Sequence, residues 1–148
     1  MKAISCHRPW AEWLILNWKK LETRRHNRLR SLVGSRLAIH ATATWDPLWF
    51  EIAYPYLTPE QVDWTVQMWD AWQIGAQNGE LLGTVMPVAH RRLTGVDEEN
   101  RAALIWTGGK YGLFVVDPIK LKTPVPWRGK QYPFDVPDEV MEERKEIT

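Results

Sequence analysis

The chain has 148 residues, a formal net charge of +1 at pH 7, 45% hydrophobic residues and 25% charged residues, which is the composition of an ordinary globular domain. It contains no apolar run of about 18 residues that could span a membrane, and no apolar core of a secretory signal near residue 1. Its single cysteine cannot form an internal disulfide. We therefore expect a cytoplasmic protein without a membrane partner.

Charge is distributed unevenly along the chain. Residues 1–40 contain nine Lys and Arg against two acids, whereas residues 41–83 contain six acids and neither Lys nor Arg. A basic segment beside an acidic one favours an anionic ligand that is met by the first part of the chain. The alternative is that folding mixes the two surfaces and removes the separation.

The first half of the chain predicts strands around short helices. In chain order, residues 2–6 predict a strand, and residues 10–18 predict a short helix behind a proline that suits its first turn. Residues 37–42 alternate in a way typical of a strand, with His40 on the face opposite the larger apolar side chains.

A helical insertion is expected next. Residues 58–61 read Thr-Pro-Glu-Gln, which has the residue types of a capping box with proline at the first helical position. Apolar residues then recur at helical spacing, so a helix is predicted as far as about Gly75. Residues 46–56 predict a shorter helix before it. The residues expected to face the core are Val62, Val66, Trp69 and Trp72.

The second half predicts further strands. Asn78-Gly79 is a turn signal, and the residues that follow as far as Leu93 predict a long strand with a bulge near Gly83 and Pro87. Residues 95–101 read as an acidic, solvated loop. A strand is predicted at residues 111–116, short extended pieces at residues 121–134, and a terminal helix or frayed end after that.

These elements favour the α+β class. Short strands with turn signals and few helices indicate a small closed or partly closed β-barrel decorated by helices, with the helical insertion between strands. We predict one domain over residues 1–136 and an acidic tail or helix over residues 137–148.

Several short motifs occur in a distinctive order over residues 2–134: KAIS, PWA, an octet, IHA, GELLGTV, GKYGLFV and LKTPVPWRGK. This order resembles the ASCH domain of the PUA-like superfamily. The family octet is Gly-x-Lys-x-x-Glu-x-Arg, and it falls here on Asn17, Lys19, Glu22 and Arg24. Asparagine replaces the glycine, but it also tolerates a left-handed backbone and can end a helix.

The resemblance implies a β-barrel with a cleft that binds RNA, DNA or nucleosides. Family members are mostly assigned to RNA-related roles. One branch of small relatives resembles amidohydrolases that act on acetylated cytidine, in which a threonine nucleophile occupies the octet's Glu position. This chain has Glu22 there, and the adjacent Thr23 is expected to point to the opposite face of a strand.

The octet also predicts a binding site from its own chemistry. In an extended segment Glu22 and Arg24 point the same way, Thr23 and Arg25 point the other way, and Lys19 precedes them at a turn. Flanking cations should keep Glu22 ionised, as a fixed hydrogen-bond acceptor. It could accept from an exocyclic amine while the cations take phosphate or carbonyl oxygens. The alternative is a structural ion pair at the helix-to-strand corner.

Basic and aromatic residues elsewhere are further candidates, each with an ordinary structural alternative. The arginines beyond the octet suit phosphate contacts or form a solvated loop, and tryptophans suit base stacking or core packing. The resemblance puts Lys130 near the cleft. The phosphate candidates are Arg25, Arg28, Arg30 and Arg36, and the candidate cleft walls are Trp10 and Trp127.

Two polar residues have a more ambiguous role. His40 either lines the cleft as a donor or is a satisfied core histidine, and Glu80 is either a carboxylate for hydrolysis or a surface acid. The other three histidines have no partners at zinc-ligand spacing, so neither a metal nor a cofactor is expected.

Three functions follow as hypotheses. The first is a nucleic-acid-binding module for RNA or single-stranded segments, with its cleft built from Lys19, Glu22, Arg24, Arg25 and Lys130. The second is a small hydrolase, an amidohydrolase or ribonuclease, acting on acylated cytidine or RNA; here Lys19 is base or electrophile, and Glu22 or Glu80 is the carboxylate. The third is an adaptor that uses the Trp-rich acidic helices.

Overall fold

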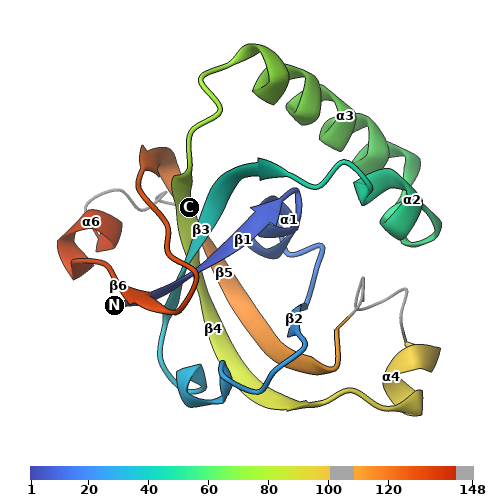
Figure 1. Cartoon of the computed structure of the whole chain (residues 1–148), viewed down its shortest axis with the longest axis vertical. Coiled ribbons are helices and arrows are strands. Elements are labelled where there is room, and N and C mark those ends of the chain that lie inside the picture. Colours follow the sequence, from blue (N-terminus) through green and yellow to red (C-terminus); the bar gives the residue numbers. More distant parts are fainter. Residues whose placement is uncertain (101–108, 143–148) are drawn as a thin grey trace.

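The computed structural model describes residues 1–100 and 109–142, and its fold is α+β. Six strands form one mixed sheet, with helices packed around it (Figure 1). The strands are β1 (Lys2–Arg8), β2 (Leu21–Arg24), β3 (Leu37–Trp45), β4 (Glu80–Arg92), β5 (Tyr111–Pro126) and β6 (Phe134–Asp135). The helices are α1 (Trp10–Ile15), α2 (Trp49–Ala53), α3 (Pro59–Ile74), α4 (Gly95–Glu99) and α6 (Asp138–Glu142), with 3-10 turns at Arg30–Leu32 and Tyr54–Tyr56.

The strand order is β2-β5-β4-β3-β1-β6. The pairing of β1 with β3 is parallel, and all other pairings are antiparallel. Within the described residues the hydrogen-bonded ladder ends at β2 and β6 and does not close, so the predicted barrel is not confirmed. None of the helices in this part of the chain is long and apolar enough to cross a membrane.

β4 and β5 are long and strongly curved (Figure 1), and the ladder between them has three register shifts. The first two shifts include Gly83 and Met86, and the third runs from Pro87 to Ala89, so the predicted bulge is confirmed. A Cβ at Gly83 would collide with the carbonyl of Ile119, which explains the glycine. Bulges bend a strand, and here they curve the sheet around α1.

α1 lies against the sheet and contributes Ala11, Leu14 and Ile15 to the largest apolar cluster. The helix ends as the octet predicts, because Asn17 has a left-handed backbone with φ of 65°. The chain then turns, with the N–H groups of Trp18 and Lys19 both donating to the carbonyl of Trp13. This turn carries the chain directly into β2, which pairs with β5.

The helical insertion between β3 and β4 is confirmed. Thr58 and Gln61 form the expected reciprocal capping box at the start of α3. Trp13, Trp45 and Trp49 are buried between the insertion and α1, and Val62, Trp69 and Trp72 pack partly buried against them. Val66 is exposed, so its predicted place on the buried face is wrong.

The prediction of a solvated loop at residues 95–101 is wrong where the structure describes it. Residues 95–99 form α4, and Asp97 is only 3% exposed. Its carboxylate accepts from the Arg91 guanidinium at 2.6 Å and from the Thr94 N–H at 2.7 Å. These bonds from Arg91 and Thr94 hold the pKa of Asp97 well below its usual range. Thr94 and Asp97 have the sequence spacing of a capping box, which indicates a helix start. The acidic composition of the segment led instead to the prediction of a loop. Arg101 lies outside the described residues.

One further difference and one confirmed alternative, the terminal helix, concern the chain after Gly109. β5 continues to Pro126 instead of breaking into short pieces, because Pro124 lies in a stretch without partners on β4, between Lys120 and Val125. The terminal segment is a helix over Asp138–Glu142 that buries Met141 in a second apolar cluster. Residues 143–148 of the predicted tail lie outside the described part of the chain.

Candidate functional site

A cavity of about 650 Å³ opens where β1, β2 and β3 meet the segment after β5. Its wall combines octet residues with polar and aromatic side chains from the other segments. The described residues that line it are Ser5, Cys6, His7, Trp10, Glu22, Thr23, Arg24, His40, Thr42, Ala43, Gly79, Trp127, Arg128, Gly129, Lys130 and Gln131.

Glu22 is the acceptor at the centre of this wall and is only 7% exposed. Its Oε2 accepts from the Cys6 thiol at 2.6 Å and from the Arg24 guanidinium at 3.5 Å, and its Oε1 accepts from the Thr23 N–H at 2.9 Å. Arg24 also donates to the carbonyl of Ser5 at 2.9 Å. These bonds fix the carboxylate, while Arg24 keeps 26% of its side chain exposed.

Lys19 is not among the described residues that line the cavity, and it is only 1% exposed. Its ammonium lies within electrostatic range of Glu22 and Cys6. Burial lowers the pKa of Lys19, and the negative charge of Glu22 opposes that shift. Lys19 therefore acts on the carboxylate through its charge, and it is not among the described residues of the cavity wall that a ligand would touch.

Cys6 sits beside Glu22 on β1 and is 4% exposed. Burial raises the pKa of the Cys6 thiol, and the neighbouring Glu22 charge raises it further. The thiol therefore stays protonated near neutral pH and serves Glu22 as a hydrogen-bond donor. Sequence reasoning treated this cysteine only as evidence of a reducing compartment and missed its place at the site.

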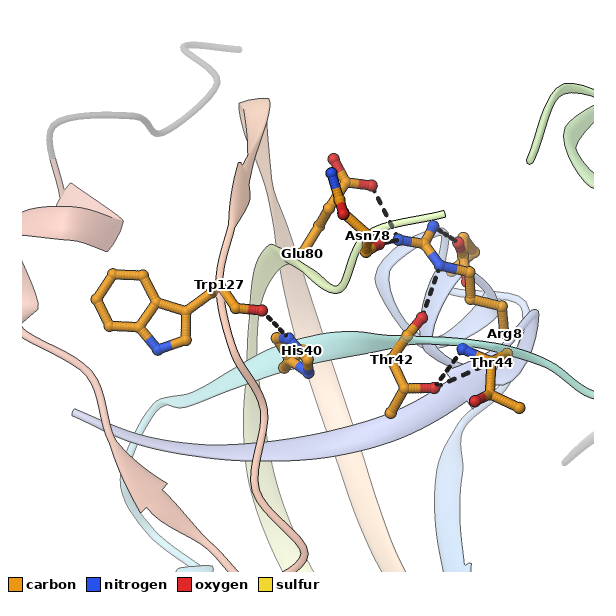
Figure 2. Close-up of polar contacts among 8 residues, drawn as sticks. Arg8, His40, Thr42, Thr44, Asn78, Glu80 and Trp127 are labelled. Atoms are coloured by element: carbon orange, nitrogen blue, oxygen red, sulfur yellow. Dashed lines mark hydrogen bonds and ion pairs between the residues drawn. The ribbon is translucent and has the colours of Figure 1, made fainter. Parts of the chain in front are cut away.

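His40 is a buried residue at the cavity wall, with both ring nitrogens bonded. Nδ1 lies 3.0 Å from the Ser5 hydroxyl, and Nε2 lies 2.7 Å from the Trp127 carbonyl, a contact drawn in Figure 2. Burial lowers the pKa of His40. The neutral ring fits both contacts if Nε2–H donates to the carbonyl and Nδ1 accepts from Ser5. His40 is thus a satisfied histidine that also lines the cavity.

Two glycines allow the close approach of the chain to His40. A Cβ at Gly79 would lie 2.9 Å from the His40 imidazole, and one at Gly129 would lie 2.5 Å from it. Real side chains do not approach so closely, so both positions require glycine. This requirement explains why the GELLGTV and WRGK motifs carry glycine at these two positions. The close packing of Gly129 against His40 also holds the segment that brings Trp127 and Lys130 to the cavity.

Arg8 is a buried arginine that donates to four acceptors, and the sequence analysis did not identify it. Figure 2 shows it reaching the Thr42 carbonyl at 3.0 Å, the Asn78 carbonyl at 3.1 Å and Glu80 at 2.8 Å. It also donates to Glu12 at 2.6 Å. The i, i+4 spacing of Arg8 and Glu12 was the available signal.

Glu22 and Glu80 line two different cavities. Glu80 lines a second cavity of about 270 Å³ together with Arg8, and it is not among the described residues of the first cavity. Thr23 lines the first cavity next to Glu22, and its side chain also lies against Gly109. The structure therefore places the two carboxylates, Glu22 and Glu80, in different cavities.

The other predicted site residues divide into two groups. Trp10 and Trp127 are half-buried and line the cavity with the exposed Lys130. Trp10 packs edge-on against Trp13 at 5.2 Å between ring centroids. Arg25 is exposed and is not among the described lining residues.

Sequence reasoning missed several lining residues besides Cys6. His7, Thr42, Arg128 and Gln131 reach the cavity, and His7 Nδ1 lies 3.0 Å from the Thr42 hydroxyl. Within the described residues no group of three or more His, Cys, Asp or Glu side chains is arranged to hold a metal ion.

A scan of the chain against protein-family models gives no match, and a search of curated proteins gives none either.

Proposed function

We propose that the chain is a nucleic-acid-binding protein of the ASCH, PUA-like kind, and that its large cavity takes a base of RNA or of another single-stranded nucleic acid. The observation that carries this proposal is the wall of the cavity, where the octet residues Glu22 and Arg24 meet. Arg128 and Lys130 add cations on the segment after β5.

The chemistry of the wall suits a nucleobase. A volume of about 650 Å³ lies in the range of small-ligand sites, which combine apolar walls with a few placed polar groups. Glu22 offers a carboxylate to an exocyclic amine, and Arg24 offers donors to a carbonyl or phosphate oxygen. Trp10 and Trp127 line the same cavity and are the candidate residues for stacking on the base.

The proposed kinship includes a PUA-like, partly closed sheet. It is supported by the order of the motifs, by the left-handed Asn17 in the place of the octet glycine, and by the curvature of β4 and β5 (Figure 1). The cytoplasmic location and the absence of a membrane role belong to the same proposal.

Fluorescence anisotropy with labelled oligo-C and oligo-U RNA and the matching DNA, at two salt concentrations, tests the function. We expect Glu22→Gln to weaken oligo-C binding about tenfold or more, because a hydrogen bond to a charged acceptor is lost, and to affect oligo-U less. Trp127→Leu should weaken both oligonucleotides similarly through lost stacking.

Lys122→Ala removes an exposed cation that is not among the described lining residues, and it serves as the control. Thermal unfolding shows which variants remain folded. The proposal fails if the wild-type protein binds no oligonucleotide at low salt, or if folded Glu22→Gln and Trp127→Leu proteins bind like wild type.

The hydrolase alternative, acting on acylated cytidine or RNA, has less support. Its proposed base, Lys19, is buried away from the described cavity wall, and its second carboxylate, Glu80, is bonded to Arg8 in another cavity. Incubation with acylated cytidines and labelled RNA, followed by chromatography, tests it. Unchanged substrates at high protein concentration would eliminate it.

A further inference from the structure

We propose that the nucleic-acid strand leaves the cavity over a phosphate track formed by Arg24, His26, Arg28 and Arg30, with Tyr132 beside it. This inference rests on the proposed function. It gives the path of the strand, which runs from the end of β2 along the loop of residues 25–36. The cations of that loop would contact the phosphates that follow the bound base.

The track is continuous with the cavity. A narrow crevice adjoins the cavity and shares Ser5, Arg24 and Gln131 with its wall. The crevice then extends to His26, Arg28 and Tyr132. Arg24 therefore lines both spaces, and a strand whose base occupies the cavity would continue over the surface above the crevice.

The loop that carries the track is held in place. The Arg28 N–H donates to His26 Nδ1 at 3.1 Å, and Leu29 is 3% exposed within the largest apolar cluster. The Arg28 guanidinium lies 5.4 Å from the centroid of the Tyr132 ring. These contacts present Arg28 at a defined place, so the ordering cost of binding is reduced.

The charge of the two exposed arginines of the track is not neutralised by acids in the described part of the chain, whereas Arg24 is paired with Glu22. Arg28 and Arg30 are exposed, and neither makes an ion pair within residues 1–100 and 109–142. Arg36, in contrast, is paired with Asp117 at 2.8 Å, so it is not part of the track. His26 lies within electrostatic range of both Arg28 and Arg24, which places these cations close to one another.

A single-stranded nucleic acid fits this surface better than an anionic membrane. Phosphates along a strand can contact successive cations, while the base enters the cavity that begins at Arg24. The exposed ring of Tyr132 adds a stacking face next to the crevice. A flat lipid surface would contact the arginines but would have no use for the adjoining cavity.

Salt-dependent anisotropy of a labelled single-stranded RNA tests the track. The variant Arg28→Ala/Arg30→Ala should lower the slope of log Kd against log salt by about 2, since each lost phosphate contact removes about one unit. At low salt its affinity for the RNA should fall at least tenfold. Binding of a free nucleoside, measured by competition, should stay unchanged, because the cavity is intact.

The control variant is Lys120→Ala/Lys122→Ala, which also removes two exposed cations and should keep the wild-type slope. A wild-type slope in folded Arg28→Ala/Arg30→Ala overturns the track while leaving the cavity proposal standing. If wild type binds neither RNA nor nucleosides, the proposed function fails. If the arginine variant loses binding to phosphatidylserine vesicles but keeps RNA binding, the surface is a membrane contact and the track is wrong.

Discussion

At the scale of single residues, the site depends on a buried charge arrangement around Glu22. Lys19 and Cys6 are almost fully buried next to it, and removing one member of a buried charge pair leaves the other uncompensated. We therefore expect Lys19 to act through its charge on Glu22, while Arg24 lines the cavity.

A double-mutant cycle measures this coupling. We expect Lys19→Met and Glu22→Gln each to lower the free energy of unfolding by about 3–5 kcal/mol. The double variant should lose clearly less than the sum, because neither Lys19 nor Glu22 is then left buried without the other. Urea unfolding of the four proteins provides the values. Additive losses would contradict the pairing of Lys19 with Glu22.

His40 predicts a dependence of stability on pH. Because burial lowers the pKa of His40 in the folded protein, the unfolded chain takes up a proton first as the pH falls below the ordinary histidine value of about 6.5. The contribution of the neutral His40 ring to the free energy of unfolding is complete above that pH. Below it, this contribution falls by up to about 1.4 kcal/mol per pH unit.

Urea unfolding at pH 7.5 and pH 5.5 tests this direction. His40→Gln should show a smaller loss on acidification than the wild-type protein, whatever its stability at pH 7.5. Burial and neighbouring cations also lower the pKa values of His26 and His90, so a residual loss is expected. If His40→Gln lost as much stability between pH 7.5 and pH 5.5 as the wild-type protein, His40 would not be a source of the pH dependence.

At the scale of elements, the corner between α1 and β2 depends on Asn17. Its φ of 65° is readily adopted by glycine and costs other residues about 1–2 kcal/mol. We expect Asn17→Gly to be neutral or slightly stabilising and Asn17→Ala to destabilise by about 1 kcal/mol, as measured by thermal unfolding. A stabilising Asn17→Ala would show that the corner does not need this backbone.

Local signals predicted much of the fold. The capping box at Thr58, the left-handed Asn17 and the bulges near Gly83 and Pro87 are set by neighbouring residues, and all are present. The hydrogen bond from the Thr94 N–H to Asp97 had a local signal of the same kind, but the acidic composition around it suggested a solvated loop.

The features that sequence reasoning missed depend on contacts between distant segments. Arg8 reaches Thr42 and Asn78 because β1 and β3 pair in parallel and the insertion returns beside them. The burial of Lys19 likewise results from packing that no local pattern records. For the site, Glu22 and Arg24 were predicted to share a face, and both line the cavity.

At the scale of the whole molecule, Arg8 joins the sheet to the insertion. Its guanidinium bonds one carboxylate on α1, one at the start of β4, and backbone carbonyls on β3 and at the end of the insertion. It also lines the second cavity beneath α3. Removing this side chain should therefore loosen the contact between the insertion and the sheet, which the tryptophan cluster also holds.

Arg8→Met should lower the free energy of unfolding by about 3–5 kcal/mol, because Glu12 is then left buried without its cation. Arg8→Lys should recover only part of this loss, since an ammonium group cannot reproduce the planar fork that serves four acceptors. Arg36→Met, which breaks a more exposed pair with Asp117, is the matched control and should cost about 1 kcal/mol or less. Urea unfolding gives the free energies, and limited proteolysis near Asn78 reports docking of the insertion. Equal losses for Arg8→Met and Arg36→Met, with unchanged cleavage, would show that the insertion is held by its tryptophans alone.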